Sequence, residues 1–340
     1  MKKIQLYIMA AAMTAMCGML TSCNEDWEEE VYEQLVSFKA PVGSNGVHDI
    51  YVRYKADGTG QFKLPVIISG SATNHRDFNV KIGVDNDTLG ILNKARFASG
   101  REDLWFRQLP ENFYSFPSQT CHVASGQNTN LYIIDFNLKG LDTNENWVLP
   151  LTVIPDPSYK LNIRSGWDKA LLNLKLFNDY SGTYSSTNMY VYIDGTNSDG
   201  AVEDTRECRV VDDRSVFFLA GTTWSEDVNR GLYKVITHFE EGVKDEKGVI
   251  TGKLTLSAGD PANAINLETS GDCTYRYEVI RHATKKYLER RITTMYLDYK
   301  YTDITSDPKN PMRFHVKGNM TMERLYDINA PEEYQAVLWR

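Results

Sequence analysis

The residue types best suited to binding chemistry lie together in one short polar segment, residues 222–230. The segment combines an indole, two carboxylates, an amide and a guanidinium, which belong to Trp224, Glu226, Asp227, Asn229 and Arg230. An aromatic face stacks on the C–H face of a sugar ring, while planar polar groups hydrogen-bond its hydroxyls. We therefore interpret the segment as a candidate glycan-binding loop. The competing interpretation is structural, with Trp224 tucked beneath its own loop.

Other candidate sites are weaker. Residues 194–200 begin with Asp194, as a calcium loop does, but Thr196 and Ser198 occupy the next ligand positions and no glutamate stands at position 12. A hairpin turn explains this segment better. The six histidines show no i, i+4 pair and no nearby cysteine pair of the zinc type. We predict no metal site, no cofactor and no catalytic residues. The one enzymatic alternative is a hydrolase whose two carboxylates lie far apart in the sequence.

The amino-terminal residues predict export and lipidation. Lys2 and Lys3 precede a short apolar run that ends near Leu20, as in a secretory signal, and the run is too short for a stable membrane-spanning helix. Residues 20–23 read Leu-Thr-Ser-Cys, which looks like a bacterial lipobox, where the signal is cut before the cysteine and the thiol is acylated. We predict a signal peptide over residues 1–22 and lipidation of Cys23. An ordinary signal followed by a chance cysteine is the alternative.

An acidic segment follows the lipidation site. Five of the seven residues 24–30 are carboxylates, and such a block repels itself and stays extended. We predict a lipidated acidic tether over residues 23–38. Acidic residues just after the lipidated cysteine also resemble the surface-export signal of Bacteroidetes lipoproteins. That resemblance implies anchorage in the outer membrane, facing the extracellular side.

Length and charge restrict the remaining possibilities. The 340 residues suggest two domains, and 37 basic against 45 acidic residues give a net charge of −8. Nucleic acid is therefore a poor partner.

Removal of the signal and acylation of Cys23 leave an odd number of cysteines. Cys208 and Cys273 could form a disulfide, or all three could be buried free thiols.

Period-two alternation from about residue 40 onward predicts an all-β chain. Residues 39–179 contain six or more short strands and suggest an immunoglobulin-like β-sandwich. A polar, turn-prone break at residues 178–182 precedes a second series of hairpin-like strands. We predict that residues 180–340 form an antiparallel β-barrel of lipocalin or calycin type, or else a second sandwich. Two helices are expected, one at residues 87–97 with Asp87 as its N-cap and one near the carboxyl terminus.

Two segments of the first half carry distinctive strand and turn signatures, residues 64–71 (Leu-Pro-Val-Ile-Ile-Ser-Gly-Ser) and 147–151 (Trp-Val-Leu-Pro-Leu). They resemble the amino-terminal domain of unknown function of a family of Bacteroidetes surface lipoproteins from polysaccharide utilisation loci. Residues 180–184 (Tyr-Ser-Gly-Thr-Tyr) resemble its calycin-like C-terminal domain, also of unknown function. The amino-terminal domain also precedes family-18 glycoside hydrolases, but their Asp-x-x-Asp-x-Asp-x-Glu motif is absent from this sequence. The resemblance assigns no binding residues.

Together these observations predict a non-catalytic cell-surface lipoprotein that binds glycan as an accessory of a Sus-type polysaccharide uptake system. Its expected partners are the glycan, the outer membrane through the lipid anchor, and a Sus-type transporter with its lipoproteins. An adhesin or pilus-type structural lipoprotein is the alternative. That role would require an exchangeable edge or terminal strand.

Overall fold

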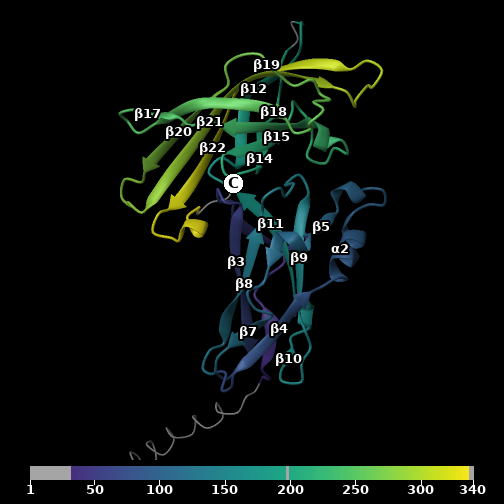
Figure 1. Cartoon of the computed structure of the whole chain (residues 1–340), viewed down its shortest axis with the longest axis vertical. Helices are drawn as coiled ribbons and strands as arrows, with labels where there is room; N and C mark the ends of the chain where they lie inside the picture. Colours follow the sequence, from purple (N-terminus) through teal and green to yellow (C-terminus); the bar gives the residue numbers. More distant parts are fainter. Residues whose placement is uncertain (1–31, 197–198, 337–340) are drawn as a thin grey trace, which may run out of the picture.

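The computed structural model describes residues 32–196 and 199–336, which form a β-sandwich followed by a closed β-barrel (Figure 1). The prediction of an all-β chain is confirmed, and the second half is the barrel rather than another sandwich. The predicted signal peptide and Cys23 lie outside the described residues. In the described part of the chain, no helix is both long and apolar enough to cross a membrane.

The sandwich consists of two mixed sheets. One has the strand order β10-β1-β3-β8-β6, made of β10 (Lys160–Leu161), β1 (Leu35–Phe38), β3 (Thr59–Ser69), β8 (Thr129–Asn137) and β6 (Tyr114–Ser115). The other has the order β2-β11-β9-β4-β7, made of β2 (His48–Arg53), β11 (Lys169–Phe177), β9 (Asn146–Val153), β4 (Phe78–Val84) and β7 (Thr120–Val123). A short strand, β5 (Phe106–Gln108), also pairs with β9.

Alternation along strands such as β4 and β8 helps to build the sandwich core. In β4, Phe78, Val80 and Ile82 are buried, whereas Asn79 and Lys81 point to solvent. Successive strand residues face opposite sides of the sheet, so one face of β4 joins the core. Burial of each such side chain contributes about 1.5–3 kcal/mol before chain entropy is counted.

The sandwich begins earlier than the predicted tether ends. Strand β1 pairs with β3 and β10, and Val36, Ser37 and Phe38 are buried. Strand β1 therefore falls within residues 23–38, the segment predicted as the tether. Its four residues give an alternation too brief to stand out beside the acidic segment.

Short helical elements lie in the connections. The expected helix is α2 (Thr88–Arg96), but Asp87 makes no side-chain capping bond. Asp85 caps it instead, because its carboxylate accepts hydrogen bonds from the backbone N–H groups of Asp87 and Thr88 and from the Thr88 hydroxyl. The 3-10 turns are η1 (Glu102–Leu104), η2 (Glu111–Phe113), η3 (Arg164–Gly166), η4 (Arg230–Tyr233) and η5 (Glu332–Tyr334). The expected carboxyl-terminal helix is represented among the described residues only by η5.

Eight antiparallel strands close the barrel, in the order β12 (Gly182–Ile193), β14 (Thr205–Val210), β15 (Ser215–Leu219), β16 (Lys234–Phe239), β18 (Ile250–Ala258), β20 (Thr274–Arg281), β21 (Leu288–Asp303) and β22 (Met312–Asp327). The last strand, β22, pairs with both β21 and β12, which closes the ring. Three two-residue strands extend it: β13 (Ala201–Val202), β17 (Val243–Lys244) and β19 (Glu268–Thr269).

Side chains fill the barrel interior. Its core is rich in tyrosine and methionine, and the buried hydroxyls of Tyr184 and Tyr275 donate to backbone carbonyls at 2.6 and 2.8 Å. The interior is thus a packed core in which these tyrosine hydroxyls are satisfied, whereas the buried hydroxyl of Thr237 has no hydrogen-bond partner among the described residues. Cys121, Cys208 and Cys273 are all free and buried, so the possible disulfide between Cys208 and Cys273 is not formed.

The two domains pack directly against each other through the connection between β11 and β12. The amide of Asn178 donates to the carbonyl of Asp212 at 2.7 Å, and Arg324 of β22 donates to the carbonyl of Asn178 at 3.0 Å. Val210, at the end of β14, is 1% exposed and belongs to the sandwich core. The connection is therefore part of a packed interface between the two domains. This interface is hereafter called the seam.

Candidate functional site

The loop that carries Trp224 connects β15 to β16 at one edge of the seam. Its base is fixed by the backbone N–H of Gly221, which donates to the buried Tyr299 hydroxyl at 3.3 Å. The Trp224 side chain is 75% exposed, the second most exposed large hydrophobic side chain described. Trp224 therefore does not tuck beneath its own loop, and its ring is open to a ligand.

The charged and amide residues of this loop are not all exposed as Trp224 is. Glu226 and Asn229 are exposed and Asp227 is half-buried, but Arg230 is only 6% exposed. Arg230 reaches across the seam to Asp103 in η1, with Nη1 3.3 Å from Oδ2 and Nη2 donating to the backbone carbonyl at 2.6 Å. The structure thus assigns Arg230 to the domain contact.

A second arginine strengthens the same contact. Arg101 pairs with the Asp103 carboxylate at 3.0 Å and donates to the backbone carbonyl of Glu226 at 2.5 Å. The hydrogen bond from Arg101 and the nearby positive charge of Arg230 lower the pKa of Asp103. The sandwich therefore holds the Trp224 loop in place through one carboxylate shared by two guanidinium groups.

A cleft of about 360 Å³ opens beside the indole, hereafter the Trp224 cleft. Its lining comes from the Trp224 loop, from β14 and β15, and from Asn144 of the sandwich. Glu203, Glu207 and Arg209 give it planar polar side chains, while Phe217 and Leu219 give it an apolar wall. Sequence analysis missed Glu203, Glu207 and Arg209, although alternation along β14 places Glu207 and Arg209 on its outer face.

Glu207 and Arg209 form a fixed pair on that face. Both Nε and Nη2 of Arg209 donate to Oε2 of Glu207, at 3.0 and 2.8 Å. Arg209 also donates to the backbone carbonyls of Thr143 and Asn144 at 3.4 and 3.3 Å, and the Thr143 hydroxyl donates to the carbonyl of Val210. A sandwich loop thus holds the guanidinium, which in turn orients the carboxylate.

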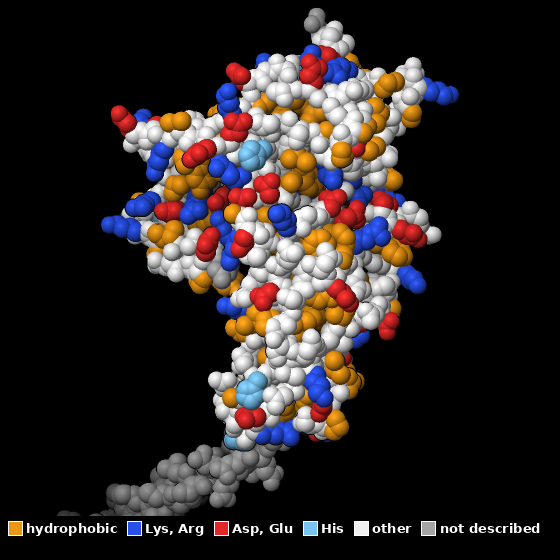
Figure 2. All heavy atoms as spheres, viewed as in Figure 1, with side chains coloured by type: hydrophobic (Ala, Val, Ile, Leu, Met, Phe, Trp, Pro, Cys, Tyr) orange, Lys and Arg blue, Asp and Glu red, His pale blue; other side chains and the backbone are white. Residues whose placement is uncertain are grey.

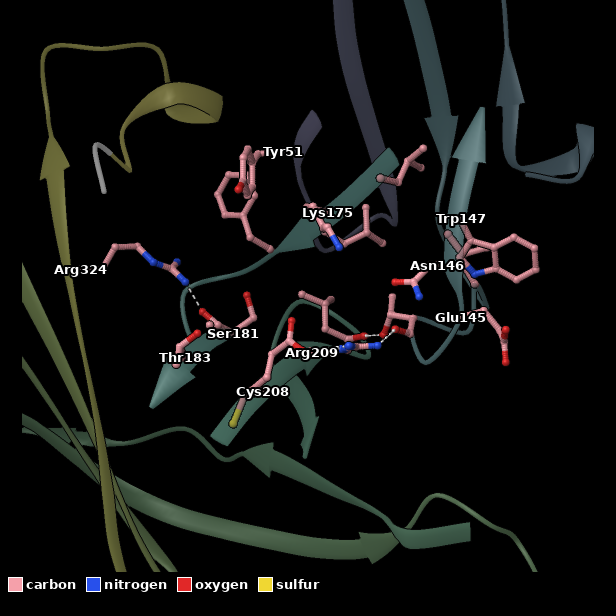
Figure 3. A pocket seen from close by; sticks show the side chains of 18 residues that line it. Tyr51, Glu145, Asn146, Trp147, Lys175, Ser181, Thr183, Cys208, Arg209 and Arg324 are labelled. Carbon is pink, nitrogen blue, oxygen red and sulfur yellow. Dashed lines mark hydrogen bonds and ion pairs between the residues drawn. The ribbon is translucent and has the colours of Figure 1, made fainter. Parts of the chain in front are cut away.

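Another cleft, of about 230 Å³, lies on the other side of this pair and is hereafter the seam cleft. Figure 3 shows its lining: the Lys175 ammonium and the Asn146 amide turn toward the space above Arg209, whereas the Trp147 indole points away from it. Lys175 stands beside Tyr51 on neighbouring parallel strands. This cleft therefore offers hydrogen-bonding groups from the sandwich opposite the outer face of β14.

The remaining polar candidates serve structural roles. Asp194, at the start of the loop that resembled a calcium site, pairs with Lys300 at 2.9 Å and with Arg313 at 3.6 Å. Two cations therefore already neutralise Asp194, the carboxylate that would occupy the first ligand position of a calcium site. Within residues 32–196 and 199–336, no group of three or more His, Cys, Asp or Glu side chains is arranged to hold a metal ion.

The fold and site define a two-domain β-protein with polar and aromatic clefts along its domain contact. Two family models match the chain: a domain of unknown function (DUF4973) at residues 27–157, and a model described as a C-terminal domain at residues 168–321. Among curated proteins, none matches.

Solved structures from Bacteroides match nearly the whole chain. A protein of unknown function from Bacteroides ovatus is 38% identical with a TM-score of 0.79, and the match covers 90% of this chain and 100% of that one. A multidomain protein that includes DUF1735, also from Bacteroides ovatus, is 38% identical with a TM-score of 0.77 and the same coverage. An auxiliary nutrient binding protein from Bacteroides thetaiotaomicron is 28% identical with a TM-score of 0.73, covering 88% and 100%. The chain belongs to the same family as these two Bacteroides ovatus proteins, and its own residues 27–157 match DUF4973.

Proposed function

We propose that this protein binds glycan at the cell surface, where a lipid on Cys23 anchors it in the outer membrane, and that it serves a Sus-type uptake system without catalysing a reaction. The observation that carries the proposal is the Trp224 indole, 75% exposed beside a cleft lined by Glu203, Glu207 and Arg209. An exposed ring next to convergent planar polar groups is the arrangement that sugar recognition requires.

Two further facts support the proposal. A relative of 28% identity that spans the same two domains is described as an auxiliary nutrient binding protein. The predicted lipobox and acidic segment would place such a binder on the extracellular side. The pilus-type alternative has less support, because β22, the last described strand, is paired on both sides rather than held at an open edge.

The test is binding of purified residues 24–340 to starch, xylan, mannan, laminarin, arabinan and polygalacturonate, with released reducing sugar measured in the same wells. We expect binding to at least one neutral polymer without product. Sugar release would instead indicate a hydrolase, and absence of binding to every polymer would refute the proposal.

Trp224→Ala is the decisive variant. We expect at least about a tenfold loss of affinity, since exposed aromatic anchors at the centre of a binding site dominate its energetics. Trp167→Ala is the matched control, because Trp167 is 51% exposed directly after η3 of the sandwich and lines neither cleft. An equal effect of the two substitutions would contradict the assignment of the site.

A further inference from the structure

The Trp224 cleft and the seam cleft share a wall. Glu207 and Arg209 line both clefts, so the space beside the indole and the space beside Lys175 lie on either side of one ion pair. Strand β14 lies between β12 and β15, and residues of β12 line only the seam cleft, whereas those of β15 line only the Trp224 cleft. A ligand that passes over Glu207 would therefore cross the outer face of β14 and enter both clefts.

Glu207 is built to contact such a ligand. Arg209 donates twice to Oε2, and Oε1 receives no hydrogen bond from any described residue. The Glu207 side chain is 54% exposed, so Oε1 is open to a hydroxyl donor. Because the carboxylate is already oriented by Arg209, little side-chain entropy would be lost when it accepts a hydrogen bond.

Charge in the Trp224 cleft is balanced. Its three arginines each face a carboxylate: Arg209 pairs with Glu207, Arg230 with Asp103, and Arg206 lies 3.8 Å from Glu203. Figure 2 shows acidic and basic side chains interspersed across the barrel and the seam on the face in view, without a broad patch of one sign. An acidic polymer would meet little uncompensated positive charge in the Trp224 cleft, and the Lys175 ammonium in the seam cleft adds a single cation. Neutral hydroxyls would find both donors and acceptors in the two clefts.

From this geometry we propose that the two clefts form one groove for a linear, neutral glycan chain, which stacks on Trp224, crosses Glu207 and reaches Lys175 of the sandwich. The inference rests on the proposed function and specifies its ligand: a chain of several uncharged sugars, bound by both domains together. A single sugar or a disaccharide would occupy only the Trp224 cleft.

The experiment compares affinities of residues 24–340 for a disaccharide and a hexasaccharide of the neutral polymer that binds, with polygalacturonate as the acidic probe. We expect the hexasaccharide to bind at least about tenfold more tightly than the disaccharide, because only the longer chain passes beyond Glu207 and gains the contacts to Lys175 and the rest of the seam cleft. Polygalacturonate should bind more weakly than the neutral polymer.

Two variants locate the groove. Glu207→Ala should lower hexasaccharide affinity by about tenfold, since hydrogen bonds to charged groups are the stronger ones. The matched control is Glu323→Ala, because Glu323 is also 54% exposed and paired with an arginine, but it lies on β22 outside both clefts. Lys175→Ala should weaken hexasaccharide binding about threefold and leave disaccharide binding unchanged. Thermal unfolding of each variant checks that the fold is intact.

The outcomes separate the two proposals. If the hexasaccharide and the disaccharide bind equally and folded Glu207→Ala and Lys175→Ala variants behave as wild type, the extended groove is refuted, while a Trp224 effect still supports glycan binding. Tighter binding of polygalacturonate would refute the neutral ligand alone. Failure of every polymer to bind refutes the proposed function and the inference with it.

Discussion

Replacing Arg230 with alanine should weaken the contact between the two domains rather than remove a sugar-binding group. Arg230 is 6% exposed, and its guanidinium makes three contacts: one to the Asp103 carboxylate at 3.3 Å, one to the Asp103 carbonyl at 2.6 Å and one to the Asp227 carbonyl at 3.1 Å. All three are lost in Arg230→Ala. The Asp103 carbonyl and part of its carboxylate then lose their donor, whereas the Asp227 carbonyl keeps the backbone N–H of residue 230 at 3.2 Å.

The cost follows from the burial of the pair. Removing one partner of a buried ion pair costs about 3–5 kcal/mol, because the other charge is left without compensation. Asp103 keeps Arg101 at 3.0 Å and its side chain is 21% exposed, so its charge stays compensated and the cost falls below that range. The main loss is the donor to the Asp103 carbonyl, and we therefore expect the free energy of unfolding to fall by about 1–3 kcal/mol.

Urea unfolding of residues 24–340, followed by tryptophan fluorescence, measures this change. Arg290→Ala is the matched control, because its side chain is 49% exposed and pairs with Glu323 at 3.6 Å on the surface. That substitution should cost less than about 1 kcal/mol. If Arg230→Ala were as stable as the control yet lost glycan affinity as Trp224→Ala does, Arg230 would be a ligand-contacting residue and our assignment to the seam would be wrong.

Two further predictions concern the stability of the scaffold. Burial raises the pKa of the Asp85 carboxyl, but hydrogen bonds from Lys169 and Thr88 outweigh burial and hold this pKa at about 2. The depressed pKa implies about 2 kcal/mol of stability that is complete above pH of about 5 and is lost as the pH falls through about 4 toward 2. The stability difference between wild type and Asp85→Asn, measured by urea unfolding at several pH values, should therefore shrink in acid, and a constant difference would contradict this. Gly221→Ala should lower the thermal unfolding temperature, because Gly221 has φ of +56° and an added Cβ would overlap the Tyr301 hydroxyl. Gly100→Ala, at φ of +85° with open space around it, should have a smaller effect.

The sequence by itself determined the β class and singled out Trp224 as the aromatic candidate. Alternation in segments such as Phe78–Val84 is a local property, since neighbouring strand residues face opposite sides of a sheet whatever the strand pairs with. Trp224 stood out for a similarly local reason, because seven of the other eight residues in its segment are polar. The lipobox around Cys23 is a linear signal as well, and its lipidation stays a prediction.

Only the tertiary structure decided how the candidate groups are used. Arg230 and Asp103 lie 127 positions apart in the sequence, so no local pattern shows that the guanidinium is buried in the seam. Closure of the barrel likewise depends on the pairing of β22 with β12. A period-two pattern predicts the strands but not their partners, so it cannot distinguish a barrel from a sandwich. The shared wall of the two clefts arises because a sandwich loop fixes Arg209 and Arg209 fixes Glu207. Side-chain position at the seam is set by contacts between distant segments, and those contacts exist only once both domains have folded and packed.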